Sequence, residues 1–165
     1  MTRRWALRTG LAAAIWMLAA LPAHACWDAA AVRYGVSSEL LYAIARTESA
    51  LDSQAIGRNP NGTRDIGLMQ INSAWLPTLA THGIGEHELL EPCTNIQVGA
   101  WILAGNLQRL GYTWDAVGAY HSAIPTRRRA YAERIYRQMA EVRRTAQLTP
   151  HSIASTELPA AALPR

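Results

Sequence analysis

Residues 37–51 read SSELLYAIARTESAL, and the spacing of their apolar side chains indicates the fold. Leu41, Ile44 and Leu51 fall on one face of a helix, because side chains three, four or seven positions apart share a face. Glu48 lies on the same face, seven residues after Leu41 and four after Ile44. We therefore predict a core helix over 37–51 that carries a carboxylate on its apolar side.

Glu48 is for this reason the candidate catalytic residue. A carboxylate held against apolar neighbours loses hydration, which disfavours its charged form and raises its pKa. A raised pKa is what a group needs if it is to donate a proton near neutral pH. The alternative is structural: Glu48 pairs with an arginine or caps a neighbouring element.

Helical patterns continue along the chain, whereas the alternation typical of a substantial sheet is missing. The fold class is therefore all-α or helix-dominated, with at most a minor β element, in a single domain. The turn cluster Asn59-Pro60-Asn61-Gly62 marks a loop. We expect this loop over 52–66, followed by a short segment over 73–79 that Pro77 interrupts. A helix capped by Thr94 and ended by Gly111 comes next, and a further helix runs from Thr113 to Tyr120. The last helix should turn four side chains inward: Tyr131, Ile135, Met139 and Val142.

The N-terminus has the three parts of a secretory signal. Arg3, Arg4 and Arg8 precede an apolar run over 11–21, and Ala23-His24-Ala25 follows. The run is shorter than a transmembrane helix requires. We therefore expect residues 1–25 to be cleaved, and the mature protein to be exported, periplasmic and without a membrane anchor.

The expected mature domain covers residues 26–144. Residues 145–165 contain Pro, Ala, Ser and Thr without periodicity, which predicts a disordered tail. Nothing in the pattern indicates an obligate dimer, so we expect a monomer.

The mature chain has two cysteines, Cys26 and Cys93. In an oxidising compartment such a pair indicates a disulfide, which by chain entropy contributes on the order of 4 kcal/mol. Two unrelated thiols are the alternative. No second cysteine or close histidine gives metal-ligand spacing, so we expect neither a metal nor a cofactor.

The formal charge of +4 comes from 16 arginines and no lysine, against 12 acidic residues. Three arginines lie in the predicted signal, and seven lie within 127–144. Without interleaved aromatic residues, this basic helix is not typical of a nucleic-acid-binding surface. A solvated face is the simplest interpretation, and an anionic wall polymer, a membrane surface or a partner protein are the others.

Three segments point to a known family. In order they are Glu48-Ser49, Gly67-Leu68-Met69-Gln70-Ile71 and Ala119-Tyr120. Their order and spacing resemble the catalytic domain of lytic transglycosylases, the soluble-lytic-murein type of glycoside hydrolase family 23, within the lysozyme superfamily. Cys26-Trp27 and Pro92-Cys93-Thr94-Asn95 are similar to the short exported members that accompany secretion and conjugation machinery. The resemblance covers residues 26 to about 140.

The resemblance implies a lysozyme-like fold and a role for Glu48. Glu48 would protonate the glycosidic oxygen between MurNAc and GlcNAc in peptidoglycan glycan strands, and would then act as base. The 6-hydroxyl of MurNAc would close on the anomeric carbon, leaving a 1,6-anhydro product without water. Local wall openings for a secretion or conjugation apparatus would be the biological result.

The resemblance also suggests substrate-binding residues. Ser49, Met69 and Gln70 match motif positions, and the latter two would line the saccharide groove. Tyr120 would bring its hydroxyl to the catalytic carboxylate, and His121 stands where the family usually has Asn. From the residues alone, core packing of Met69, a surface position for Gln70, an ordinary half-buried Tyr120 and a space-filling His121 remain open.

Two other functions remain open. A lysozyme-type hydrolase would use the same acid but let water attack, with Asp52 or Asp65 as a possible second carboxylate. A non-catalytic wall-binding scaffold would dock through its basic last helix or its tail. The intact Glu48 argues against the scaffold, because a protein without catalysis is free to lose its acid.

Overall fold

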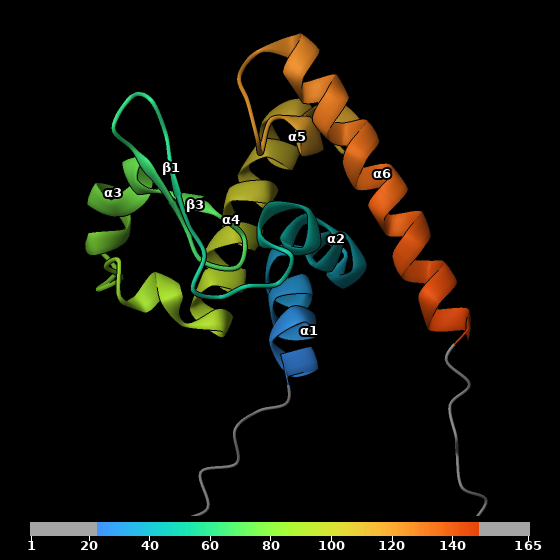
Figure 1. The fold of residues 1–165 in the computed structure, drawn as a ribbon, viewed down its shortest axis with the longest axis horizontal. Helices are drawn as coiled ribbons and strands as arrows, with labels where there is room; N and C mark the ends of the chain where they lie inside the picture. The colour runs from blue at the N-terminus through green and yellow to red at the C-terminus, as the bar shows by residue number, and fades with distance from the viewer. Residues whose placement is uncertain (1–22, 149–165) are drawn as a thin grey trace, which may run out of the picture.

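The structure is a computed structural model that describes residues 23–148 of the 165-residue chain. The predicted signal lies outside these residues apart from 23–25, and the predicted tail apart from 145–148. The described chain is helix-dominated with one small sheet, and in Figure 1 the sheet and the last helix lie on either side of helix α4 (Pro92–Leu110). The helix-dominated fold class is thereby confirmed. No helix within 23–148 is long and apolar enough to cross a membrane.

Helix α2 (Ser38–Ser49) is the helix predicted from the quoted stretch. The Ser37 side chain accepts a hydrogen bond from the Leu40 N–H and caps its first turn. Leu41 and Ile44 are fully buried, as their spacing predicts. The helix ends before Leu51, because Ala50 adopts a left-handed conformation with φ 55°.

The segment expected as a loop contains two strands. β1 (Ile56–Arg58) and β2 (Arg64–Ile66) pair antiparallel through the turn at 59–62, and β3 (Ile71–Asn72) adds to β2. The turn prediction was right and the loop prediction was wrong. Strands of two or three residues are too short for an alternating pattern to be recognised.

Two helix starts differ from the predicted ones. The segment after the sheet forms a 3-10 turn η1 (Ser73–Trp75) and helix α3 (Leu76–Ala80), in which Pro77 lies in the first turn and does not interrupt it. A second 3-10 turn, η2 (Glu88–Leu90), precedes α4 (Pro92–Leu110). Helix α4 thus begins at Pro92 instead of Thr94, because proline lacks an N–H that the first helical position does not use.

The C-terminal helices follow the predicted order. Thr113 caps α5 (Trp114–Gly118) by accepting from the Ala116 N–H, and this helix ends two residues before Tyr120. Helix α6 (Pro125–Leu148) extends four residues past the expected domain end, so 145–148 are helical. Its Tyr131 and Ile135 are buried, as predicted.

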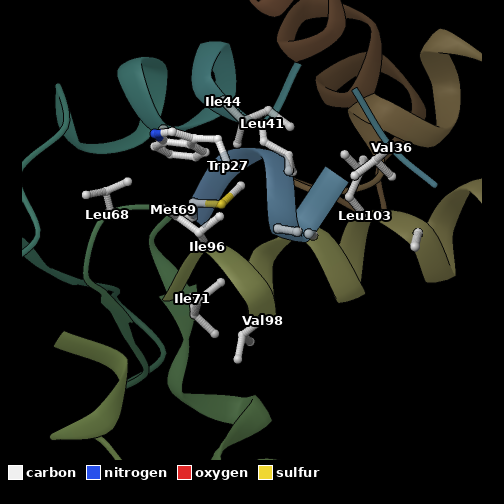
Figure 2. Packing of buried hydrophobic residues seen from close by; sticks show 14 of the residues in the cluster. Trp27, Val36, Leu41, Ile44, Leu68, Met69, Ile71, Ile96, Val98 and Leu103 are labelled. Carbon is white, nitrogen blue, oxygen red and sulfur yellow. The ribbon is translucent and has the colours of Figure 1, made fainter. Parts of the chain in front are cut away.

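The core brings together side chains from α1 (Ala23–Tyr34), α2, α4 and the segment after β2. Figure 2 shows Trp27 of α1 and Ile44 of α2 close to Met69 and Ile96. A disulfide joins Cys26 to Cys93, with 5.3 Å between the Cα atoms, and thus links α1 to the first turn of α4. This is the pairing expected from the sequence.

Asn95 on α4 is the fully buried polar residue that connects the helix to the sheet region. Its Oδ1 accepts from the Met69 N–H at 2.6 Å, and its Nδ2 donates to the Ile66 and Leu89 carbonyls at 2.9 and 2.7 Å. Three backbone groups of buried residues are therefore satisfied by a single amide.

We expect Asn95→Ala to lower the free energy of unfolding by about 3 kcal/mol, because it leaves buried backbone groups without partners. Asn106→Ala is the matched control on the same helix. Asn106 is also buried, but its Oδ1 accepts from the Arg109 side chain and its Nδ2 has no partner among the described residues. Urea unfolding of both variants tests this, and equal losses would contradict it.

Candidate active site

The Glu48 side chain lines a cleft of about 570 Å³ that lies between the sheet and the connection from α5 to α6. The sheet side contributes mostly polar groups, and the opposite side contributes Tyr120, His121 and Arg127. The remaining lining residues are Asn59, Pro60, Asn61, Thr63, Asp65, Gln70, Ile71, Asn72, Trp75, Ile102 and Ser122. The penultimate residue of α2 thus presents a carboxylate to an open, largely polar groove.

Burial raises the pKa of Glu48, as the sequence predicts. A hydrogen bond from Tyr131 opposes this by stabilising the ionised carboxylate. The charge of Asp65 raises the pKa further, and the charge of Arg134 lowers it. The carboxyl group therefore has an elevated pKa together with a partner that favours its charged form.

The tyrosine that touches Glu48 is Tyr131, not Tyr120. The Tyr131 hydroxyl donates to Glu48 Oε1 at 2.5 Å, and Tyr131 as a residue is 1% exposed. The Tyr120 hydroxyl instead donates to the Met69 carbonyl at 2.9 Å. The position of Tyr131 on the apolar stripe of the last helix predicts only a core residue. A buried tyrosine hydroxyl needs a polar partner, and that requirement was the available signal.

Asp65 is the second carboxylate of the cleft. Asn59 Nδ2 donates to its Oδ2 at 2.9 Å, and Asn72 Nδ2 donates to its Oδ1 at 2.7 Å. These amides come from the β1–β2 turn and from β3, so the sheet fixes the orientation of the carboxylate. Asp52, the other acid considered, does not line the cleft, and its Oδ1 accepts from the Gln54 N–H.

Of the motif residues, Met69 has a different place from the one expected. Its side chain is fully buried against Gly99, so it packs in the core and does not line the groove. The reason is its hydrogen-bonded backbone: the N–H binds Asn95 and the carbonyl binds Tyr120, which turns the side chain toward α4.

Ser49 is not a lining residue of the cleft either. Its hydroxyl donates to the Leu68 carbonyl at 2.7 Å and so ties the end of α2 to the motif segment. Gln70 does line the cleft, with φ 50°. Its Nε2 donates to the Ala55 and Gly67 carbonyls, which leaves its Oε1 as the free acceptor of this amide in the described chain.

Residues 25–141 match the family described as the transglycosylase SLT domain. The chain belongs to this family. It is therefore a peptidoglycan lytic transglycosylase, and because peptidoglycan lies outside the cytoplasm, the enzyme acts there.

Similar proteins include bacterial relatives and a solved structure. Invasion protein IagB of Salmonella typhimurium strain LT2 is 44% identical over 128 residues, which cover 74% of this chain and 80% of that protein. Protein IpgF of Shigella flexneri is 37% identical over 122 residues, covering 71% and 80%. The structure of an inactive mutant of lytic transglycosylase Slt from Pseudomonas aeruginosa has a TM-score of 0.60 and 23% identity, covering 74% of this chain and 24% of that one. This last likeness shows a common fold.

His121 of this SLT domain stacks on the tyrosine that holds Glu48. The His121 and Tyr131 rings are parallel within 2°, with centroids 4.8 Å apart. Desolvation and then the charge of Arg134 lower the pKa of His121, the charge of Asp65 opposes them, and the charge of Arg127 adds a last lowering effect. The imidazole is thus favoured in its neutral form. Among the described residues, no group of three His, Cys, Asp or Glu side chains could hold a metal ion.

Tyr131→Phe removes a hydrogen bond that favours the ionised Glu48, so we expect the pKa of Glu48 to rise above its already raised value. The limb of the pH–rate profile that reports loss of the Glu48 proton should move to higher pH. Carbon-detected NMR titration of the Glu48 carboxyl group measures the same change directly.

Tyr120→Phe is the matched control, since it also removes one buried hydroxyl but leaves the bond to Glu48 intact. It should destabilise the fold by about 1 kcal/mol without a comparable shift. Equal shifts in the two variants, or a fall in the Glu48 pKa on Tyr131→Phe, would refute the assignment.

Proposed function

We propose that this enzyme cleaves the β-1,4 bond between MurNAc and GlcNAc and leaves a 1,6-anhydroMurNAc end, with Glu48 as acid and then as base. The observation that carries the proposal is the environment of Glu48: burial raises its pKa, while the Tyr131 hydroxyl supports its charged form. A residue that must first give a proton and then take one back needs both influences.

The proposed reaction proceeds in two proton transfers. Protonated Glu48 donates to the glycosidic oxygen, the bond from that oxygen to MurNAc C1 breaks, and C1 gains oxocarbenium character. The Glu48 carboxylate, stabilised by Tyr131, then takes the proton of the MurNAc 6-hydroxyl, whose oxygen bonds to C1. Glu48 is protonated again at the end of the reaction, and no water is consumed.

The other cleft residues are proposed to bind the glycan strand. Gln70 presents an amide oxygen, and Tyr120 and His121 form the facing wall. Trp75, which is 37% exposed, offers an aromatic surface for a sugar ring, and an edge-to-face contact with Trp101 at 5.3 Å holds it. We propose that Ser49 and Met69 do not contact sugar and instead hold the cleft residues in place, Ser49 through the Leu68 carbonyl and Met69 through Tyr120.

Hydrolysis is the second candidate, because Asp65 lies in the same cleft as Glu48. In this reaction water would attack C1, and the product would have a reducing end. Both Asp65 oxygens already accept from asparagine amides, which supports a fixed electrostatic role near C1 rather than attack on it.

Digestion of purified sacculi with the mature enzyme and with Glu48→Gln tests the reaction. We expect the wild type to release 1,6-anhydro muropeptides and Glu48→Gln to release none. Anhydro products are lighter than the corresponding hydrolysis products by the mass of one water. Glutamine keeps the size and accepts from Tyr131 but cannot transfer the proton. Mass spectrometry reads the products, and reducing ends from the wild type would replace transglycosylation by hydrolysis.

Asp65→Asn removes a negative charge that raises the pKa of Glu48, so the pKa of Glu48 should fall. It also removes charge that would stabilise the oxocarbenium-like transition state, and we expect turnover to drop at least about tenfold. The anhydro product should remain the product. Rates are compared with Asp52→Asn, an acid outside the cleft, and an equal loss in both variants would remove Asp65 from the mechanism.

We further propose that the enzyme is exported through the N-terminal signal and makes local wall openings for a secretion or conjugation apparatus. The invasion protein among the relatives, the Cys26-Trp27 start and the Pro92-Cys93-Thr94-Asn95 segment support this assignment. A purely scaffolding role is disfavoured by the intact acid and its tyrosine partner.

A further inference from the structure

A second groove, of about 560 Å³, lies between α5 and α6 and shares no lining residue with the Glu48 cleft. Trp114 and Asp115 at the start of α5 form one side, and the outward face of α6 forms the other. The α6 residues that line it are Pro125, Arg129, Ala132, Glu133, Tyr136 and Arg137.

Two aromatic rings in this groove are exposed and touch each other. Trp114 is 44% exposed and Tyr136 is 61% exposed, and their centroids are 5.5 Å apart in an edge-to-face arrangement. A single exposed aromatic residue needs no explanation, but adjoining rings along a groove indicate a surface that binds something. The contact between the rings also limits their motion, so little side-chain entropy remains to be lost on binding.

The groove is lined by two arginines and two acidic residues, and one of these acids is neutralised by an arginine outside the lining. Asp115 forms an ion pair with Arg128, in which Arg128 Nη1 lies 2.9 Å from Asp115 Oδ2. Arg129 and Arg137 have no ion-pair partner within 23–148, and Glu133 is the remaining acid of the lining. A ligand that fits has flat apolar faces and carries carboxylates.

The groove and the catalytic cleft are linked through Arg128, whose Nε donates to the carbonyl of the cleft residue Ser122 at 3.0 Å and whose Nη1 donates to the groove residue Asp115 at 2.9 Å. Ser122 and Arg127 line the cleft, whereas Pro125 and Arg129, in the same connection and first turns of α6, line the groove. The two surfaces are therefore neighbours at the N-terminal end of α6.

We propose that this groove binds a stem-bearing glycan strand of peptidoglycan outside the catalytic cleft. The C–H faces of the pyranose rings pack on Trp114 and Tyr136, and stem-peptide carboxylates pair with Arg129 and Arg137. The inference builds on the proposed function, which names this polymer as substrate. A strand bound there keeps the domain on an insoluble wall between cleavage events.

The test uses binding to insoluble sacculi by co-sedimentation, with Glu48→Gln as the parent so that cleavage does not interfere. Trp114→Ala with Tyr136→Ala should weaken binding about tenfold, and Arg129→Ala with Arg137→Ala by a similar factor. Tyr112→Ala and the pair Arg33→Ala with Arg46→Ala are matched controls, since these exposed residues line neither groove nor cleft. The controls should stay within about twofold of the parent.

Chitin separates the two chemistries, because it is an insoluble β-1,4 GlcNAc polymer without stems or carboxylates. The aromatic pair should weaken binding to chitin as well, and the arginine pair should not. Thermal unfolding checks that each variant is folded, and Tyr136→Ala alone, at the more exposed ring, is the second variant if the double one does not fold.

Groove variants that bind sacculi as the parent does would overturn the proposal, which is the result expected if the surface serves a protein partner instead. An arginine effect on chitin equal to that on sacculi would overturn the carboxylate assignment. Failure of the proposed function would be seen separately, as absence of anhydro products from the wild-type enzyme while sacculus binding is still measured.

Discussion

The Asn95 side chain is the interaction on which the cleft depends. Its amide binds the Met69 N–H and the Ile66 and Leu89 carbonyls, so it fixes the end of β2, the motif segment and η2 to α4. Gly67 lies directly against this amide with φ 74°, and a Cβ there would overlap Asn95 Nδ2. The glycine that opens the motif is thus explained by a buried asparagine 28 residues later in the chain.

Glu48 depends on this arrangement from two directions. The motif segment, tied to Ser49 through the Leu68 carbonyl, sets the end of α2. Helix α6 supplies Tyr131 from the other side, and His121 stacks on that ring. The carboxyl group is therefore buried by one part of the fold and hydrogen-bonded by another, and its proton affinity reflects the balance.

Periodicity made α2, α4 and α6 predictable, because helices this long repeat their apolar face several times. The same reasoning found Glu48 as an acid on an apolar stripe. It could not find β1 and β2, which are three residues each, nor the exchange of roles between Tyr120 and Tyr131. Which hydroxyl reaches a carboxylate depends on how α6 packs on α2, and residue spacing within one helix carries no information on that.

The disulfide gives the domain a dependence on its surroundings. Cys93 precedes Asn95 by two residues, so the covalent link from α1 enters α4 beside the amide that organises the cleft. In a reducing cytoplasm this link does not persist, and α1 is then held by packing alone. The covalently linked form of the domain is consequently a product of oxidising conditions, and a newly made chain in a reducing compartment holds α1 without this bond.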